Sequence, residues 1–252
     1  MQVHAYVLHL TRATARRDNA HALKDILGPA SEIWPAVDGS ALSSQDLSTG
    51  VGSMLFDPHY PFPLKPGEIG CFLSHRQIWA DLQMRDADAA LIVEDDAVID
   101  PTLFREAAIL AQTHIQELGY VQFQTRPSKG PSTLIDSAGP SRLIVPQQAG
   151  LRTTAQLVSK AAAAHLLKLS DPIDRPVDTF VQSHWHTGLR PAMVYPSGVG
   201  DGAGGGSTIQ AGKKSVWEKL TREVSRALYR KAVTRLSRQS PAPAEGGLTR
   251  GQ

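Results

Sequence analysis

The segment A-A-L-I-V-E-D-D-A-V-I-D, residues 89–100, decides the fold of this chain. Its first five residues form an apolar run of strand length. Such a run is typical of a strand that is buried on both faces, as in a mostly parallel sheet. Three carboxylates follow directly, at Glu94, Asp95 and Asp96. Because ligands in open α/β sheets bind beyond the carboxyl ends of the strands, these acids are the first candidates for a functional site.

The three adjacent acids have two interpretations. They form a solvated turn that ends the strand, or they hold a ligand. Adjacent carboxylates repel one another and lose hydration at the edge of a core, and a hard divalent cation or nearby bases offset that cost. Alternate residues at a strand end can converge on one side, so Glu94 and Asp96 are the expected metal ligands. Asp95 is then expected to point inward, toward a basic or helix N-terminal partner. Oxygen ligands alone favour Mn²⁺ or Mg²⁺.

On both sides of this strand, apolar periodicity predicts strands that alternate with helices. This order indicates an α/β fold with a doubly wound, mixed but mostly parallel sheet and flanking helices. Pro35 restricts the second strand to an edge or an early end. Residues 38–65 and 125–140 are expected to be loops. The expected strands are 4–10, 32–37, 89–93, 120–124, 153–158 and 192–195, and the expected helices are 14–27, 67–84, 101–118, 160–169 and 179–186.

Composition is that of an ordinary globular enzyme. The 252 residues are 41% hydrophobic and 20% charged, which fits one domain or one domain with an appendage. No run of about 18 apolar residues exists, so no membrane span is expected. No basic segment precedes an apolar stretch at the N-terminus, so a secretory signal is not expected. Cys71 is the single cysteine, which favours the cytoplasm and a role as a small buried hydrophobe.

Charge divides the chain at residue 212. Residues 213–252 carry ten Lys and Arg against three Glu, a net charge of +7, while the whole chain carries +2. The body is therefore acidic, which argues against nucleic-acid binding. Within the tail, 213–238 repeats apolar residues at helical spacing opposite a basic face. This helix either binds an anionic membrane surface, with Trp217 at the interface, or docks on the body. Residues 240–252 are Pro- and Gly-rich and expected to be disordered.

Four segments together resemble glycosyltransferase family 25, the lipopolysaccharide and lipooligosaccharide core glycosyltransferases that also include collagen galactosyltransferases. The first two are P-G-E-I-G-C-F-L-S-H-R-Q-I-W, residues 66–79, and L-I-V-E-D-D, residues 91–96. The strand and Arg-rich turn at 5–17 agree, and so do T-T-A-Q-L-V-S-K-A-A-A-A-H-L-L at 153–167 and P-V-D at 176–178. The resemblance covers roughly residues 3–210, in matching order.

The resemblance implies a GT-A-like catalytic domain over residues 1–212. It also implies transfer of a hexose, galactose above all, from a UDP-sugar to a lipopolysaccharide-core or other surface-glycan acceptor. Inversion and a divalent metal are expected, with the Glu-Asp-Asp segment standing where related folds carry Asp-X-Asp. Two other classes stay open: a metal-dependent nucleotidyltransferase, and a non-catalytic glycan- or membrane-binding homologue. The expected location is cytoplasmic, or peripheral on the cytoplasmic face of the inner membrane.

Donor contacts are expected from residues near the first strand and the long helix. Arginine suits a diphosphate because its planar fork donates two parallel hydrogen bonds. Arg12 lies closest to the end of the strand and matches the family, so it is the favoured contact, with Arg17 beside it. For Arg16 and Arg17 a solvated first helical turn is the alternative. Glu68, from the family's Gly-Glu-Ile-Gly-Cys segment, and the acids Glu94 and Asp95 complete the expected donor-binding set.

The candidate general base is Asp178, which matches the family's Pro-Val-Asp. Inverting transfer needs a carboxylate or His that takes the proton of the acceptor hydroxyl, and Asp174 is a second candidate. The alternative is that Asp178 is the N-cap of the following helix. His75 follows Ser74 directly, and neighbouring helical residues do not face each other, so a buried, hydrogen-bonded His75 is expected. The glycines at 198–207 form a late G-x-G-x-x-G, which indicates a mobile loop.

Overall fold

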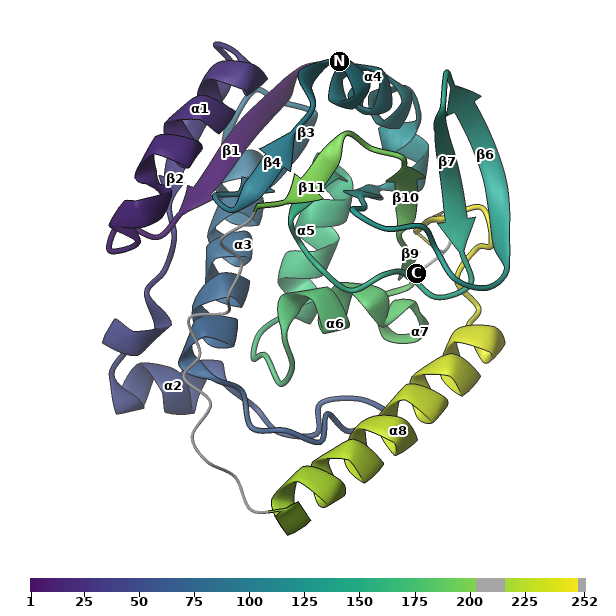
Figure 1. Ribbon diagram of the computed structural model, residues 1–252. Helices are drawn as coiled ribbons and strands as arrows, with labels where there is room; N and C mark the ends of the chain where they lie inside the picture. Colours follow the sequence, from purple (N-terminus) through teal and green to yellow (C-terminus); the bar gives the residue numbers. More distant parts are fainter. Residues whose placement is uncertain (203–215, 249–252) are drawn as a thin grey trace.

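The computed structural model describes residues 1–202 and 216–248, and an eight-stranded sheet forms its centre (Figure 1). The strands lie in the order β2-β1-β3-β8-β5-β10-β7-β6. Two short pairs, β11-β4 and β12-β9, are separate from this sheet. The strands are β1 (Val3–His9), β2 (Ser31–Pro35), β3 (Ala89–Glu94), β4 (Ala97–Ile99), β5 (Tyr120–Phe123), β6 (Ser132–Ala138), β7 (Ser141–Pro146), β8 (Ala155–Ser159), β9 (Leu189–Arg190), β10 (Ala192–Tyr195), β11 (Val199–Asp201) and β12 (Gly247–Leu248).

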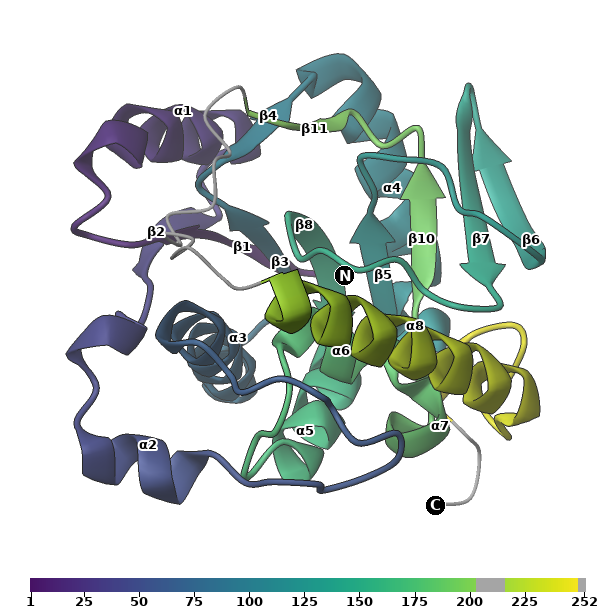
Figure 2. The same cartoon turned by 60° about the horizontal axis from the view of Figure 1, so that its bottom comes forward.

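Helices cover both faces of the sheet. Figure 2 shows α1 and α4 above it and α3, α5 and α6 below it, and the buried apolar residues form one cluster on each side. This arrangement confirms the α/β class and is consistent with a GT-A-like fold. The helices are η1 (Thr14–Arg16), α1 (Arg17–Leu27), η2 (Gly39–Ala41), α2 (Ser44–Gly50), α3 (Pro66–Met84), α4 (Pro101–Leu118), α5 (Lys160–Leu169), α6 (Val177–Gln182), α7 (His184–Thr187) and α8 (Val216–Gln239).

Strand β3 is the buried central strand that its sequence predicts. Leu91 and Val93 pack into the cluster with α1 and α4, while Ala90 and Ile92 pack into the cluster with α3 and α5. β3 runs parallel to β1, with Glu94 opposite Leu8, and antiparallel to β8. The carboxyl end of β3 therefore meets the end of β1 and the start of β8. The segments that follow β1 and β3, and the segment that precedes β8, therefore lie at the same edge of the sheet.

The sheet is mixed, but parallel pairing is not in the majority. Within the described part of the chain, the eight-stranded sheet has three parallel and four antiparallel pairings. The parallel pairings join β2, β1 and β3, and β5 and β10. The expectation of a mostly parallel sheet is corrected because β8 runs antiparallel to both of its neighbours. Its residues are all buried, and a strand that is buried on both faces does not reveal its direction in its sequence.

The structure contains elements that the sequence pattern does not indicate. Residues 125–140, expected to be a loop, include β6, which pairs with β7 through a bulge between Leu134 and Asp136. β6 is a mostly exposed edge strand, so it lacks the alternation that marks a half-buried strand. The loop at 38–65 contains α2, and two short helices, α6 and α7, replace the single helix expected at 179–186. The bounds of α4, α5 and β10 agree with the expectation.

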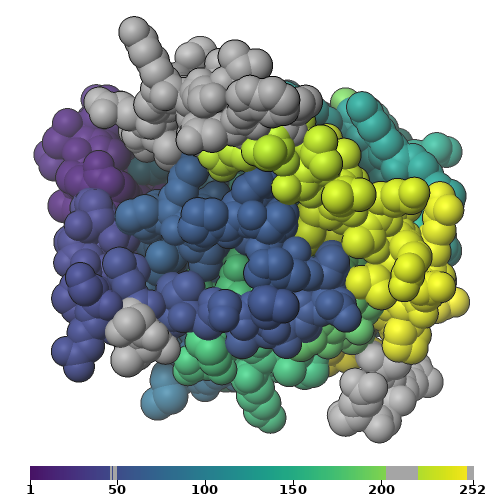
Figure 3. All heavy atoms as spheres, turned by 90° about the horizontal axis from the view of Figure 1, so that it is seen from below, coloured from purple at the N-terminus to yellow at the C-terminus, as the bar shows by residue number. Residues whose placement is uncertain are grey.

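Helix α8 docks on the body of the protein, which is one of the two interpretations of the basic tail. Figure 3 shows α8 side by side with the segment that precedes α3. Val233 is 2% exposed and Ser237 is fully buried, and the Gln147 side chain donates to the Ser237 carbonyl at 2.7 Å. Val224 and Leu228 stay exposed, so membrane binding by this outer face remains a prediction. Among the described residues, no helix is long and apolar enough to cross a membrane.

The chain after α8 is ordered against the body over residues 240–248, so the expectation of disorder is wrong there. Ala242 is 5% exposed, and its carbonyl accepts a hydrogen bond from Arg190 at 3.3 Å. β12 pairs with β9, which fixes the direction of the chain. Glycine and proline suited this segment to tight turns rather than to disorder. The described residues do not include 203–215 and 249–252, nor the side chain of Trp217. Most of the glycine-rich segment and the start of the basic tail therefore lie outside them.

The docking of α8 can be measured with a pair of valines on the same helix. Val233→Ala should lower the free energy of unfolding by about 2 kcal/mol, because it leaves a cavity beneath α8. Val224→Ala, at a position that is 52% exposed, should leave it nearly unchanged. Urea unfolding followed by circular dichroism measures both. Equal effects at the two positions would mean that α8 is not packed on the body in solution.

His184 should make the protein sensitive to acid. It is fully buried, with Nδ1 3.1 Å from the Gln182 carbonyl and Nε2 3.4 Å from the Ser237 carbonyl. Burial, with the nearby Arg190 charge, lowers its pKa from 6.5 to about 4. The unfolded chain then binds a proton that the folded chain does not, so stability falls as the pH drops from 6.5 to about 4.

The comparison with His184→Asn isolates this contribution, since other buried histidines titrate in both proteins. The parent should lose on the order of 1–3 kcal/mol more than the variant between pH 7 and pH 4. Unfolding curves at a series of pH values measure the difference. Parallel pH profiles would show that His184 does not carry the effect.

Candidate active site

The predicted acids lie at the edge where β1 and β3 end and β8 begins. The Asp95 amide donates to the Leu8 carbonyl at 3.1 Å, and the Glu94 amide donates to the Thr154 carbonyl at 2.9 Å. These main-chain bonds place the acids between the turn after β1 and the loop before β8. A small cavity of about 180 Å³ opens here, lined by Leu8, Leu10, Arg12, Arg16, Ala36, Val37, Asp38, Gly39, Gly67, Cys71, Ser74, Glu94 and Asp95.

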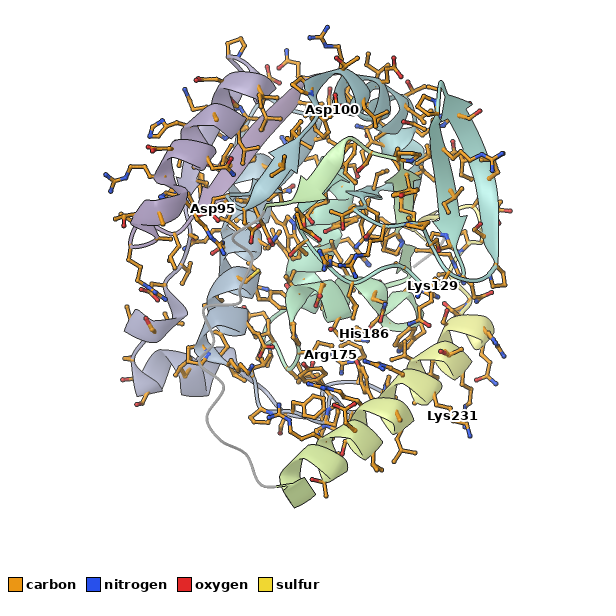
Figure 4. The ribbon with its side chains drawn as sticks, in the orientation of Figure 1. Asp95, Asp100, Lys129, Arg175, His186 and Lys231 are labelled. Carbon is orange, nitrogen blue, oxygen red and sulfur yellow. The ribbon has the colours of Figure 1, made fainter. Side chains whose placement is uncertain are left out.

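Asp95 points inward, as predicted, and is 5% exposed. His9 Nδ1 lies 2.7 Å from one carboxylate oxygen, and Arg16 donates to the other at 3.0 Å. The Asn19 amide donates to the Asp95 carbonyl at 2.8 Å. The carboxylate thus ties the end of β1 and the start of α1 to β3. Figure 4 shows Asp95 at this junction. It also lines the small cavity, so a contact with a donor remains a prediction.

Two arginines line the small cavity, but they are not the pair that the sequence favours. Arg16 bridges Asp95 and Asp96, with Nη1 3.2 Å from Asp96 Oδ2. Arg12 pairs with Asp38 at 2.6 Å and is the main cause that lowers the Asp38 pKa to about 2. Arg17 is exposed in the first turn of α1 and is not among the residues that line the small cavity. The turn of η1 directs Arg16 rather than Arg17 to the site, and sequence spacing does not reveal such a turn.

Glu94 carries the most perturbed charge of the site. The Thr153 hydroxyl donates to its carboxylate at 2.5 Å. Burial, together with repulsion from Asp96 and Asp178, raises the Glu94 pKa to about 7, against the lowering effect of this hydrogen bond. Three carboxylates therefore act on one another across the edge of the sheet. Such a cluster favours a cation among them.

Cys71 and His75 approach Glu94 from one face of α3. The ligand atoms of these three residues lie within 4.8 Å of one another. His75 is fully buried, as predicted, with Nδ1 3.3 Å from the Gln156 amide, and its Nε2 has no hydrogen-bond partner within residues 1–202 and 216–248. Burial lowers the His75 pKa to about 4 and raises the Cys71 pKa.

The donor chemistry of this site fits a divalent cation. The carboxylate oxygens of Glu94 and Asp96 suit Mn²⁺ or Mg²⁺, whereas a thiol and an imidazole suit softer metals such as zinc. Asp96 is about one-third exposed, so it is accessible, although it shares its charge with Arg16. Spacing in the sequence reveals Glu94 and Asp96 but not the approach of Cys71 and His75, which depends on how α3 packs against β3.

Asp178 belongs to α6 and does not precede it. The helix begins at Val177 with Pro176 as its N-cap, so the interpretation of Asp178 as the N-cap is corrected. Its carboxylate accepts hydrogen bonds from the Thr179 amide at 2.6 Å and from the Arg152 amide at 3.3 Å. Burial raises the Asp178 pKa. Residues 152 and 153 therefore connect the two perturbed carboxylates, since Arg152 contacts Asp178 and Thr153 contacts Glu94.

The carboxylate of the second base candidate, Asp174, already binds other groups of the protein. It forms a buried ion pair with Arg175 at 2.7 Å and accepts the Leu55 amide at 3.0 Å. Glu68 also has a structural contact, because its carboxylate accepts the Lys65 amide at 2.8 Å and completes a capping box at the start of α3. Glu68 does not line the small cavity. Of the two base candidates, Asp178 is the one whose carboxylate no ion pair neutralises among the described residues.

A large cavity of about 610 Å³ lies between α8 and the sheet. Arg152 and Thr179, which hold the Asp178 carboxylate, form part of its lining. The rest comes from the loop after β5, the loop before β8, α6, α8 and residues 60–62. Glu94 thus lines a small cavity with two arginines, and Asp178 is held by two residues that line a large cavity next to α8. The two cavities can hold two ligands near these acids.

Comparison with known proteins identifies the family of this chain. The sequence model of glycosyltransferase family 25 (LPS biosynthesis protein) matches residues 2–181. A glycosyltransferase 25 family member of Aedes aegypti is 38% identical over 108 residues, 42% of this chain and 18% of that protein. Procollagen galactosyltransferase 2 of Homo sapiens is 38% identical over 96 residues, 36% of this chain and 15% of that protein.

A third relative covers more of the chain. The inactive glycosyltransferase 25 family member 3 of Mus musculus is 30% identical over 185 residues, 70% of this chain and 31% of that protein. The chain spans less than a third of the length of each of these three relatives. Its match to the family model nevertheless extends from β1 through most of α6 and includes all three acids of the site. This chain belongs to glycosyltransferase family 25.

Proposed function

We propose that this chain transfers a hexose from a UDP-sugar to a hydroxyl group of a glycan acceptor, with inversion at the anomeric carbon. The observation that carries the proposal is the pair of half-buried carboxylates, Glu94 and Asp178, held by the adjacent residues Thr153 and Arg152. The name of the procollagen galactosyltransferases supports galactose as the sugar. The description of the family as LPS biosynthesis proteins supports a lipopolysaccharide-core or other surface-glycan acceptor.

The donor would lie in the small cavity. Arg12 and Arg16 line it and carry the planar forks that suit a diphosphate. Glu94 and Asp96 would hold a divalent cation, which when bound stabilises the charge that develops on the leaving diphosphate. Arg16 is held by Asp95 and Asp96, so its guanidinium is oriented before the donor arrives. A fixed donor of hydrogen bonds stabilises developing charge without reorganising.

Asp178 would act as the general base. The acceptor hydroxyl approaches from the large cavity and attacks the anomeric carbon from the face opposite the diphosphate. A new carbon–oxygen bond forms, the bond to the diphosphate oxygen breaks, and the hydroxyl proton passes to the Asp178 carboxylate. Burial raises the pKa of Asp178 and so increases its basicity. The Thr179 and Arg152 amides hold both carboxylate oxygens and fix their direction.

A panel of UDP-sugars with Mn²⁺ tests the function. Release of UDP, by transfer or by slow hydrolysis, is the expected result. Release of pyrophosphate would instead indicate the nucleotidyltransferase. Binding of UDP-sugars without any turnover would indicate a non-catalytic homologue, a class to which the name of the inactive mouse relative points.

The metal assignment predicts a loss of activity at Asp96 and a loss of stability at the adjacent Asp95. Asp96→Asn should lower UDP release by on the order of 100-fold and leave stability nearly unchanged, because Asp96 is partly exposed. Asp95→Asn should lower the free energy of unfolding by roughly 2–4 kcal/mol, because it removes the buried negative charge that lies between His9 and Arg16. Full activity in excess chelator, or an Asp96→Asn enzyme as fast as the parent, would refute the assignment.

The base assignment is tested with Asp178→Asn, and Asp174→Asn serves as its control. Asp178→Asn should keep its affinity for the UDP-sugar and lose on the order of 100-fold or more in turnover. Asp174→Asn should unfold more easily, because Arg175 is fully buried, and keep its turnover per folded molecule. Steady-state kinetics and donor titration measure the two effects. Near-normal turnover in Asp178→Asn would leave it a purely structural role at the start of α6.

A further inference from the structure

The large cavity carries an excess of positive charge that the proposed reaction does not use. Five basic side chains line it: Arg126, Lys129, Arg152, Arg226 and Arg230. They come from the loop after β5, from the loop before β8 and from α8, so three separate parts of the fold direct cations to one space. No element of the proposed donor site requires this charge, because Arg12 and Arg16 line the other cavity.

Part of this charge is neutralised within the protein. Asp201 forms an ion pair with Arg152, and Arg126 lies 4.0 Å from the other oxygen of Asp201. Glu223 pairs with Arg226 at 2.5 Å on α8. Among the side chains that the structure describes, which exclude those of Asp46 and Glu218, no carboxylate lies within 4 Å of the charged groups of Lys129 and Arg230. These two cations face the cavity with their charge unbalanced, so an anion that entered between them would be stabilised.

The other groups of the cavity suit a sugar. Tyr60 and Tyr229 form an aromatic wall, with ring centroids 5.6 Å apart at nearly a right angle. The Thr125 hydroxyl is a buried atom with no hydrogen-bond partner among the described residues, and it lines the cavity. Aromatic faces cover the apolar face of a sugar ring, and a free hydroxyl pairs with a sugar hydroxyl. A volume of about 610 Å³ is typical of a cavity for a small ligand.

We infer that the large cavity binds the acceptor, and that the acceptor is a saccharide that carries a phosphate or carboxylate group. The identification as the acceptor rests on the proposed function, because it uses the contacts of Asp178 with Arg152 and Thr179, which line the large cavity. The preference for an anionic saccharide rests on the cavity alone. Lys129 and Arg230 bind the anionic group, while Tyr60, Tyr229 and Thr125 contact the sugar.

Binding can be measured without turnover. Glucose 6-phosphate, glucuronate, glucose and inorganic phosphate are titrated into the full chain by calorimetry, in the presence of saturating UDP. Glucose 6-phosphate or glucuronate should bind roughly tenfold or more tightly than glucose, and more tightly than inorganic phosphate. The stronger of the two identifies the anionic group. UDP should not displace either one, because it occupies the small cavity.

Variants of residues that line the cavity, and of one neighbour that does not, locate the site. Lys129→Gln and Arg230→Gln should each weaken binding of the anionic sugar roughly tenfold. Lys231→Gln is the matched control, because Lys231 neighbours Arg230 but does not line the cavity. Figure 4 shows Lys231 on the side of α8 away from the sheet and Lys129 on the loop that faces the helix. The control should bind as the parent does.

Several results would overturn the inference: equal binding of glucose and glucose 6-phosphate, equal binding of inorganic phosphate, displacement by UDP, or the same loss in Lys231→Gln. Failure of the proposed function gives a different pattern. Asp178→Asn should bind the anionic sugar normally whether or not it transfers. A protein that binds the anionic sugar but releases no UDP would retain the inferred site and refute the transferase.

Discussion

The burial of β3 with three acids at its end is the constraint on which the site depends. A strand that is buried on both faces cannot shift its register without exposing apolar side chains, so Glu94, Asp95 and Asp96 are held at the edge where β1 ends. Asp95 is turned inward and would be an uncompensated charge without His9 and Arg16. This contact connects the turn after β1 to β3 and turns the acids on either side of it toward the cavity and the solvent.

The loop before β8 couples the two halves of the site. Its adjacent residues Arg152 and Thr153 contact Asp178 and Glu94, so two desolvated carboxylates from distant parts of the chain share one support. Their mutual repulsion raises the pKa of Glu94 beyond what burial produces alone. Perturbed acids of this kind cluster at functional sites, because a fold has no structural reason to bring like charges together.

Helix α8 lies outside the part of the chain that the family model matches, unlike the acids of the site. The family model matches residues 2–181, and α8 begins at Val216. The helix nevertheless closes the large cavity through Arg226, Tyr229, Arg230 and Val233. The proposed donor side thus lies within the range that the family model matches, and one wall of the proposed acceptor side lies beyond it.

Local pattern was sufficient for much of this protein. The bounds of α4, α5 and β10, the buried β3, and the inward direction of Asp95 follow from periodicity, capping residues and the placement of acids after an apolar run. These features depend on neighbours in the sequence. The tertiary structure decided the direction of β8, the edge hairpin β6–β7, and the choice of Arg16 over Arg17. It also brought Arg152, Thr153, Cys71 and His75 to the acids and α8 to the large cavity. Those contacts join residues far apart in the chain, and their geometry is set by how helices pack on the sheet, which no local pattern records.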